Sequence, residues 1–236
     1  MTLVTYAIPA YNLKAKPAKK KGAKGTTQEQ FLARRTKYLN AQAQRFQDRI
    51  MQEKVENIYK IGKKLGKGAF GIVHIVNRRC FKNKKFALKI IHRDRLRADV
   101  SLLEKELQLL ISLDHPNIID FDELYMDDQN FAFVTQHCKG GDLFHQQAKQ
   151  PTMVFPESTA AKIVKQILLA IKYCHDRGVC HRDLKLDNIM IEEEEVTEDP
   201  IVKVIDFGLA DYFISDQKME GMVGTPYYFA PEMVMK

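Results

Sequence analysis

The densest set of chemically useful side chains lies in residues 181–188 (HRDLKLDN), and Asp206-Phe207-Gly208 follows 18 positions after Asn188. The octet places a carboxylate, an ammonium and an amide on one short segment, and Asp206 adds a second carboxylate. Carboxylates orient hydroxyl protons, cations neutralise developing charge, and hard oxygen donors hold Mg²⁺. These are the groups that transfer of a phosphoryl group from a metal-bound nucleotide requires.

A second candidate element is the glycine pattern Gly66-x-Gly68-x-x-Gly71-x-Val73, which lies between two predicted strands. Glycine lets a backbone approach phosphates and offer amide donors without a side-chain clash. The spacing alone is weak, because similar patterns open dinucleotide-binding folds and ordinary tight turns. A dinucleotide fingerprint needs a helix next, whereas residues 73–76 (VHIV) have the composition of a strand, so we exclude it.

Lys89 and Glu106 follow the glycine pattern in order. Lys89 lies in an alternating strand, FALKI, where an isolated lysine would simply extend its ammonium to solvent. Glu106 lies on the next predicted helix, where it could be a surface residue, as Glu104 could. Because of their order after the glycines, we interpret Lys89 and Glu106 as an ion pair that orients the lysine on phosphates.

The elements that must position these groups follow from hydrophobic periodicity. They are strands at 58–66, 71–79 and 84–91, a helix at 99–112, strands at 119–125 and 130–136, and a helix at 157–176. The helix at 157–176 is apolar nearly all round and must therefore be buried on several sides. Short strands on either side of the acidic stretch 192–199 indicate a hairpin.

The charge is uneven along the chain. Residues 1–58 hold twelve Lys and Arg against four Asp and Glu, a net of +8, so −1 remains for residues 59–236. This argues against a specific nucleic-acid-binding domain. No apolar run approaches the length of a membrane span, and the cysteines form no Cys-x-x-Cys pair, so we expect an intracellular protein with reduced thiols.

Two segments precede the motifs. Residues 1–26 are a basic tail with almost nothing to bury, which we expect to be disordered; it is either solvated or a nuclear-localisation or anionic-membrane segment. Thr27 begins a capping-box pattern, and apolar spacing then predicts an amphipathic helix over about 28–56, within an extension at 27–57. That helix packs on the following domain or, alternatively, makes a partner-binding or autoinhibitory contact.

In this order and at these spacings, the motifs from the glycine pattern to Ala230-Pro231-Glu232 resemble the eukaryotic protein kinase family over residues 58–236. The resemblance implies an α+β, two-lobed fold, with a β-rich N-lobe and hinge at 58–138 and a partial, mainly helical C-lobe at 139–236. Local similarity is greatest to the calcium/calmodulin-dependent and calcium-dependent kinase group. No EF-hand loop occurs in these residues, so calcium is not an implied ligand.

The resemblance also implies ATP and Mg²⁺ as cofactors. The implied nucleotide-binding residues are Gly66, Gly68, Gly71, Val73, Ala87, Lys89, Glu106, Gln136, Cys138 and Met190. Thr135 would guard the pocket behind the adenine. The pair Gln136-His137 departs from the Glu-Tyr common in this hinge, and we expect little loss of nucleotide binding, because hinge backbone groups bind the adenine.

By the same resemblance, Asp183 is the catalytic aspartate and Lys185 neutralises the transferring phosphoryl group. His181 and Phe207 would be packing residues of an internal spine. The implied metal ligands are Asn188 and Asp206.

The acceptor class is indicated by Lys185, two residues after Asp183, and by residues 224–228 (GTPYY), both of which resemble serine/threonine kinases. Asp142 and Asp187 fall where related kinases carry acids that bind basic substrate residues. We therefore expect Ser/Thr acceptors near Arg or Lys.

Arg182 resembles the arginine that waits for a phosphate on the activation segment. The only Ser or Thr between the Asp-Phe-Gly motif and Gly224 is Ser215, which is poorly placed for that role. Glu220 either supplies a fixed negative charge instead or is an ordinary exposed glutamate. Thr225 is expected to be structural, near Asp183 and Lys185.

The sequence ends four residues after Glu232, whereas family kinases continue for several helices. The prediction is a serine/threonine protein kinase acting on protein substrates, without a transmembrane segment, in the cytoplasm and also the nucleus. The alternative is a truncated nucleotide-binding or scaffolding fragment with impaired turnover, although intact Lys89, Asp183, Asn188 and Asp206 argue against loss of the active site itself.

Overall fold

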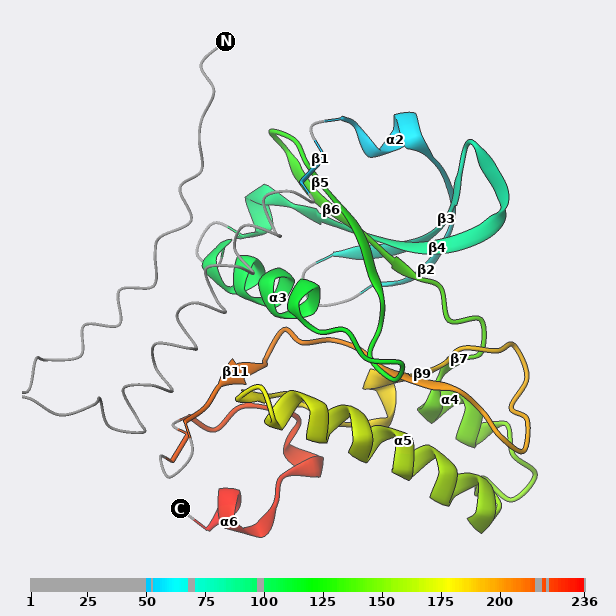
Figure 1. Ribbon diagram of the computed structural model, residues 1–236, viewed down its shortest axis with the longest axis vertical. Coiled ribbons are helices and arrows are strands. Elements are labelled where there is room, and N and C mark those ends of the chain that lie inside the picture. The colour runs from blue at the N-terminus through cyan, green and yellow to red at the C-terminus, as the bar shows by residue number, and fades with distance from the viewer. Residues whose placement is uncertain are drawn as a thin grey trace, which may run out of the picture. The chain divides into compact units, whose positions relative to one another are not determined.

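The computed structural model contains a six-stranded sheet in the order β1-β5-β6-β4-β3-β2 (Figure 1). Its strands are β1 (Ile50–Met51), β2 (Tyr59–Lys67), β3 (Ile72–Arg78), β4 (Phe81–His92), β5 (Phe121–Met126) and β6 (Asn130–Gln136). Strands β2 to β6 pair antiparallel and lie where the sequence predicts them. The structure describes residues 50–51, 53–67, 71–96, 100–214, 218–219 and 221–235, which belong to one unit starting at Ile50.

Strand β4 shows why the sheet separates a core from a cavity. Side chains alternate across a strand, so Phe86 and Leu88 face one side while Ala87 and Lys89 face the other. Phe86 and Leu88 are buried in a cluster with Tyr59 and other apolar residues. Ala87 and Lys89 line a cavity instead. One alternating strand thus contributes to both the hydrophobic core and the site.

The N-terminal border of this sheet differs from the prediction. A helix was expected over about 28–56, but Ile50–Met51 form strand β1, parallel to β5, with Ile50 opposite Leu124. A four-residue helix, α2 (Val55–Ile58), follows and buries Val55. Pairing with the edge of β5 overrides local helix propensity, because the backbone N–H and C=O groups at a sheet edge are stabilised by hydrogen bonds to an adjacent strand. The rest of that predicted helix, residues 28–49, lies outside the described residues.

Helix α3 (Val100–Ser112) confirms the helix predicted at 99–112 and lies beside the sheet in Figure 1. Leu103, Leu107 and Leu110 recur at spacings of four and three residues and are buried, as expected for one face of a helix. We call residues 50–136 the sheet lobe.

Residues 141–235 form what we call the helical lobe. Its elements are β7 (Gly141–Asp142), α4 (Leu143–Ala148), α5 (Glu157–His175), β8 (Val179–Cys180), the 3₁₀ turn η2 (Leu186–Asn188), β9 (Ile189–Ile191), β10 (Val202–Val204), β11 (Asp211–Tyr212), the 3₁₀ turn η3 (Pro226–Tyr228) and α6 (Pro231–Val234). Strands β9 and β10 pair antiparallel across the acidic stretch, which confirms the predicted hairpin. The sequence did not predict α4, a short helix that Asp142 caps by accepting a hydrogen bond from the His145 amide.

Helix α5 confirms the helix predicted at 157–176, but its burial was overestimated. Thr159, Ile163, Ala170 and Cys174 are buried and follow one stripe of the helix. Three apolar residues elsewhere on it, Val164, Leu168 and Leu169, are exposed. Within the described residues, α5 is therefore packed on one side only.

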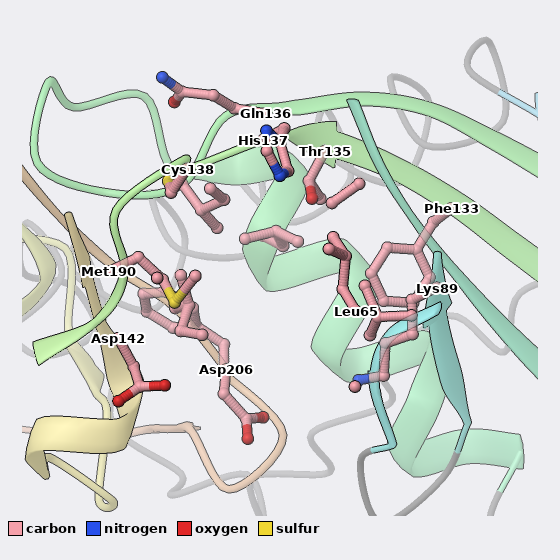
Figure 2. A pocket seen from close by; sticks show the side chains of 18 of the residues that line it. Leu65, Lys89, Phe133, Thr135, Gln136, His137, Cys138, Asp142, Met190 and Asp206 are labelled. Carbon is pink, nitrogen blue, oxygen red and sulfur yellow. The ribbon is translucent and has the colours of Figure 1, made fainter. Parts of the chain in front are cut away.

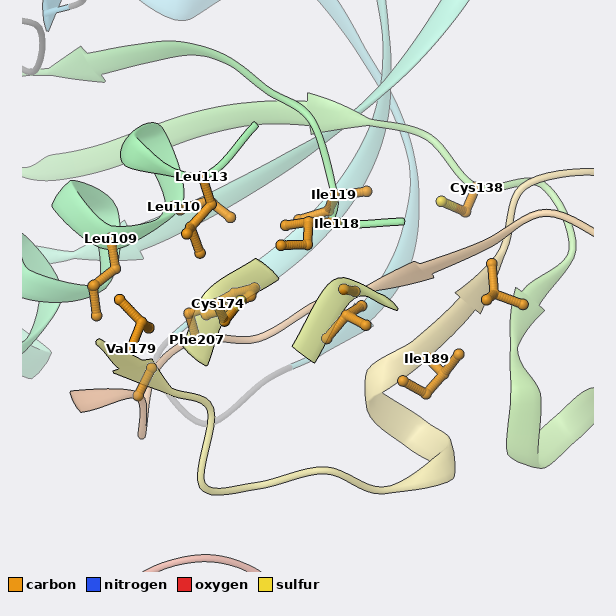
Figure 3. Close-up of a cluster of buried hydrophobic side chains, with 14 of the residues drawn as sticks. Leu109, Leu110, Leu113, Ile118, Ile119, Cys138, Cys174, Val179, Ile189 and Phe207 are labelled. Carbon is orange, nitrogen blue, oxygen red and sulfur yellow. The ribbon is translucent and has the colours of Figure 1, made fainter. Parts of the chain in front are cut away.

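A hydrophobic cluster joins the two lobes behind the site (Figure 3). Leu109 and Leu110 of α3 belong to it, as does Leu113, which follows the helix, together with Cys174 of α5 and Phe207, which is 1% exposed. Because Phe207 directly follows Asp206, this packing fixes where the Asp206 carboxylate lies.

Candidate active site

A cavity of about 450 Å³ is lined by residues of both lobes (Figure 2). Of the residues implied in nucleotide or metal binding, those that line it are Gly66, Val73, Ala87, Lys89, Glu106, Gln136, Cys138, Met190 and Asp206. Figure 2 shows Thr135, Gln136 and His137 along one side, with Lys89 and Asp206 on the opposite side. Residues as far apart in the sequence as Leu65 and Phe207 thus meet around one space large enough for a small ligand.

Lys89 and Glu106 form the predicted ion pair. Lys89 Nζ lies 3.4 Å from Glu106 Oε1, and the Glu106 side chain is 6% exposed. Burial raises the pKa of the Glu106 carboxyl, and the negative charge of Asp206 adds to the rise, while Lys89 opposes it. Lys89 therefore provides the charge that favours the ionised form of a buried carboxyl, and Glu106 in turn holds the ammonium at the cavity.

Asp183 is surrounded by donors. Its Oδ1 accepts a hydrogen bond from Thr225 Oγ1 at 2.7 Å, and its Oδ2 lies 2.9 Å from Lys185 Nζ. Asn188 Nδ2 donates to Oδ2 at 3.1 Å and to the Asp183 carbonyl at 2.8 Å. Burial opposes ionisation, but the hydrogen bonds from Lys185, Thr225 and Asn188 outweigh it and hold the pKa of Asp183 below its usual value.

Lys185 also donates to Thr225 Oγ1 at 3.0 Å, so a closed triangle of contacts joins Asp183, Lys185 and Thr225. The structure therefore confirms that Thr225 lies near both residues. The hydrogen bond to Asp183 raises the pKa of Lys185, which remains a cation.

His181 and Phe207 are both buried, and their ring centroids lie 4.8 Å apart, which confirms them as packing residues. His181 Nε2 lies 3.0 Å from the Ile205 carbonyl, and the Asp183 amide donates to His181 Nδ1 at 3.2 Å. These bonds attach the segment carrying Asp183 to the segment carrying Asp206. Burial lowers the pKa of His181, so the ring is neutral and can accept from that amide.

Asp206 has a φ of 62°, a left-handed conformation that is uncommon for a residue other than glycine. Such strain persists only where surrounding contacts hold it, and it is frequent at functional sites. Here the following residue, Phe207, is anchored in the core cluster, while Asp206 lines the cavity.

The comparison with known families decides the identity of this arrangement. Residues 59–236 match the family model described as "Protein kinase domain". The chain belongs to the protein kinase family. The predicted α+β, two-lobed kinase fold is thereby confirmed.

Several curated kinases are similar in sequence. The chain is 37% identical over 184 residues to calcium-dependent protein kinase 5 of Plasmodium falciparum (isolate 3D7), which covers 77% of this chain and 31% of that protein. It is 36% identical over 184 residues to calcium-dependent protein kinase 24 of Arabidopsis thaliana, covering 75% and 30%. Calcium-dependent protein kinase 4 of Plasmodium falciparum (isolate 3D7) is 40% identical over 178 residues, covering 75% and 33%. The chain thus spans about a third of the length of these relatives.

The segment predicted to be the hinge follows β6 and connects the sheet lobe to the helical lobe. The Gln136 amide donates to the Asp120 carbonyl, and the Lys139 amide donates to the Glu192 carbonyl. Between them, the Cys138 N–H has no backbone acceptor among the described residues, and Cys138 lines the cavity. A free amide donor at this place fits a flat heterocyclic base. Burial raises the pKa of the Cys138 thiol to about 12, which makes it unreactive.

The three glycines of the kinase pattern lie in different surroundings. A Cβ added at Gly66 would meet nothing within 4 Å, and Gly66 lines the cavity. A Cβ at Gly71 would lie 2.2 Å from the Ile90 carbonyl oxygen, so this glycine is required by the close approach of β4. Gly71 does not line the cavity, and Gly68 lies outside the described residues.

Sequence reasoning missed several apolar residues that line the cavity. They are Leu65, Leu110, Ile119, Phe133 and Ile205. Leu65 and Ile205 directly precede the motif residues Gly66 and Asp206, so their positions were available from the sequence. The others have no chemical signature, because an apolar residue in a strand or helix looks the same whether it faces a cavity or the core.

No resident metal site stands out in the kinase. Among the described residues, no group of three or more His, Cys, Asp or Glu side chains is gathered to hold an ion. Asn188 and Asp206 offer two oxygen ligands, which fits Mg²⁺ carried by a nucleotide, because Mg²⁺ commonly takes one or two protein ligands and completes its shell with phosphates and water. In the described part of the chain, no helix is long and apolar enough to cross a membrane.

Proposed function

We propose that the protein is a serine/threonine protein kinase that transfers the γ-phosphoryl group of Mg²⁺-ATP to Ser or Thr hydroxyls of proteins. The observation that carries the proposal is the closed triangle of contacts among Asp183, Lys185 and Thr225, next to the cavity that Lys89 and Asp206 line. A nucleotide-binding module without transfer would need Lys89 and Asp206, but it would need neither Asp183 nor Lys185 in this arrangement.

The cavity supports the proposed nucleotide site. The free Cys138 N–H and the Gln136 carbonyl of the hinge would bind the adenine edge, while Val73, Ala87 and Met190 would pack on its faces. Lys89 would bind the inner phosphates. When bound, Mg²⁺ would neutralise phosphate charge, and Asn188 and Asp206 are the residues that would hold it.

The electrostatics of Asp183 support its role as the group that orients the acceptor hydroxyl. Because its pKa is lowered, Asp183 is ionised at neutral pH and can accept a hydrogen bond from a Ser or Thr hydroxyl. Lys185, held 2.9 Å from that carboxylate, would stabilise negative charge on the phosphoryl group during transfer. Asp183 would thus act as the base for the acceptor hydroxyl, with the Lys185 cation held next to it.

We further propose a preference for Arg or Lys near the acceptor. Asp142 caps α4 and lines the cavity. Asp187 is exposed within residues 181–188, which we call the catalytic segment. Both oxygens of the Asp142 carboxylate are already engaged, since Oδ1 accepts from the His145 amide at 2.8 Å and Oδ2 lies 2.7 Å from His145 Nδ1. Asp187 is therefore the more available of the two acids for a basic substrate residue.

The test uses the full-length protein with Mg²⁺-ATP. Nucleotide binding is followed by thermal shift, and phosphoryl transfer is measured on a Ser/Thr peptide array with varied basic residues. We expect binding and transfer, with Asp183→Asn retaining binding and losing transfer. Binding without transfer in the unmutated protein would favour the nucleotide-binding or scaffolding alternative, and an array without enrichment for basic residues would reject the substrate preference alone.

A further inference from the structure

Asp211 lies between two charged residues for which the proposed reaction gives no role. Lys105 precedes Glu106 on α3, and Arg182 precedes Asp183 in the catalytic segment. Asp211 Oδ1 lies 2.5 Å from Lys105 Nζ, and Oδ2 lies 3.3 Å from Arg182 Nη2. One carboxylate therefore joins helix α3 of the sheet lobe to the catalytic segment of the helical lobe.

The Asp211 carboxylate is itself held in place. Asp211 belongs to β11, where it pairs with Cys180 of β8, two residues before Arg182. Its Oδ1 accepts a hydrogen bond from the Tyr212 amide at 2.8 Å. Although burial opposes ionisation, the contacts with Lys105, Tyr212 and Arg182 lower the pKa of Asp211. The Asp211 carboxylate is thus anchored to a strand pair and remains an anion. We call its contacts with Lys105 and Arg182 the bridge.

Arg182 is also fixed at several points. Its φ is 65°, an unfavourable value for a residue with a side chain. Its Nε donates to the Leu209 carbonyl at 2.6 Å, in addition to the contact with Asp211. A Cβ added at Gly224 would lie 2.6 Å from the Arg182 carbonyl oxygen, so the backbone is tightly enclosed there. These contacts set the direction of the peptide that leads into Asp183.

The exposure of the bridge indicates where its effect lies. The side chains of Lys105, Asp211 and Arg182 are 22%, 35% and 19% exposed. Ion pairs that reach solvent contribute little to the free energy of folding. A misplacement of about 1 Å in an active site, by contrast, can cost on the order of 10²-fold in rate. The effect is therefore expected in catalytic geometry and not in stability.

We propose that Asp211 is a positioning residue that couples α3 to the catalytic segment and supplies Arg182 with its anion from within the chain. Through Lys105 it holds the helix that carries Glu106, and through Arg182 it holds the residue before Asp183. The inference rests on the proposed kinase function and adds a regulatory consequence. Because Arg182 already contacts a carboxylate, transfer does not require a phosphate on the activation segment. Ser215 and Glu220, considered for that role above, lie outside the described residues.

The test compares Asp211→Asn, Lys105→Met and the double variant in the full-length protein. Asn keeps the shape of Asp211 without its charge, and Met keeps the length of the lysine stem. The matched control is Asp176→Asn, which removes a surface ion pair of the same type at the C-terminal end of α5, where Lys172 Nζ lies 2.6 Å from Asp176 Oδ2. Measurements are kcat, KM for ATP, and hydrogen exchange of the α3 backbone amides.

We expect Asp211→Asn to lower kcat by roughly three- to thirtyfold and to speed exchange in α3. The double variant should be no worse than Asp211→Asn, Asp211→Glu should recover part of kcat, and phosphatase treatment of the unmutated protein should leave kcat unchanged. Unchanged kcat and unchanged α3 exchange in Asp211→Asn would overturn the proposal, as would strict additivity in the double variant.

Two further outcomes keep the test decisive. If Asp211→Asn does not fold, Lys105→Met decides alone, and unchanged α3 exchange in that variant rejects the bridge. If the unmutated protein binds ATP but transfers no phosphate, the proposed function fails, whereas α3 exchange still reports on the bridge. Loss of kcat after phosphatase treatment would reject only the inference that transfer requires no phosphate on the activation segment.

Discussion

The two charged clusters of the active site are held in different ways. Lys89 and Glu106 come from β4 and α3, which follow one another in the chain and lie 17 residues apart at these positions. Asp183 depends on Thr225, 42 residues further along. Bringing the second pair together closes a much longer loop, which costs more conformational entropy. A conformational change in the segment leading to Thr225 can therefore break or form the contacts of the Asp183 cluster.

The difference is also one of electrostatics. Burial raises the pKa of Glu106, and a single cation opposes that rise, so the cluster in the sheet lobe depends on one partner. Three donors lower the pKa of Asp183, so the ionised form of this carboxyl in the helical lobe is stabilised by several partners. Removing one partner should thus cost more in the first cluster than removing one donor in the second.

The largest expected effect is that of Asp183→Asn, which removes the carboxylate at the centre of the Asp183 cluster. We expect kcat to fall by about 10²- to 10⁴-fold, because a positioned base is lost while the hydrogen-bonding shape is kept. ATP affinity, measured by calorimetry, should stay nearly the same. Retained transfer would mean that another group orients the acceptor hydroxyl.

Lys89→Met should lower kcat by roughly 10²-fold, because a cation that contacts phosphates is removed. It should also change the dependence of stability on pH. Without Lys89 the pKa of Glu106 rises further, so the folded state binds a proton more tightly than the unfolded state does. The variant should therefore lose stability, relative to the unmutated protein, as the pH rises above the already raised pKa that Glu106 has in the unmutated protein. Denaturant titrations at acidic and neutral pH measure this, and equal losses at both would contradict it.

Thr225→Val should have a smaller effect, about tenfold on kcat, since one of several donors to Asp183 is lost. Removing that donor raises the pKa of Asp183, so the acidic limb of the pH profile of kcat/KM should move to higher pH. An unshifted limb would show that Thr225 does not tune Asp183. Comparison with Lys89→Met tests whether a shared cluster is more tolerant than a single ion pair.

Gly71→Ala should affect stability more than chemistry. The added Cβ would lie 2.2 Å from the Ile90 carbonyl, and we expect a loss of roughly 2 kcal/mol in the free energy of unfolding, as for other overpacked sites. Gly66→Ala is the matched control, because its Cβ would meet nothing within 4 Å. Urea denaturation of both variants measures the difference, and equal stabilities would place no packing requirement on Gly71.

Much of the fold was predictable because its elements are locally encoded. The alternating character of residues 86–90 predicted the strand, and hydrophobic periodicity predicted α3. Strand β1 was not predictable, since Ile50 and Met51 form a strand only where the edge of β5 is present. The short helix α4 was missed because it begins at a cap and not at a periodic apolar pattern.

The sequence by itself determined the types and order of the chemical groups, and with them the kinase family and the pairing of Lys89 with Glu106. Only the tertiary structure decided how Asp183 is surrounded, that Cys138 presents a free amide, and that Asp211 joins Lys105 to Arg182. The physical reason is distance along the chain. Local periodicity fixes which way a side chain faces within one element, whereas contacts between remote segments depend on how the elements pack and on which donors that packing leaves unpaired.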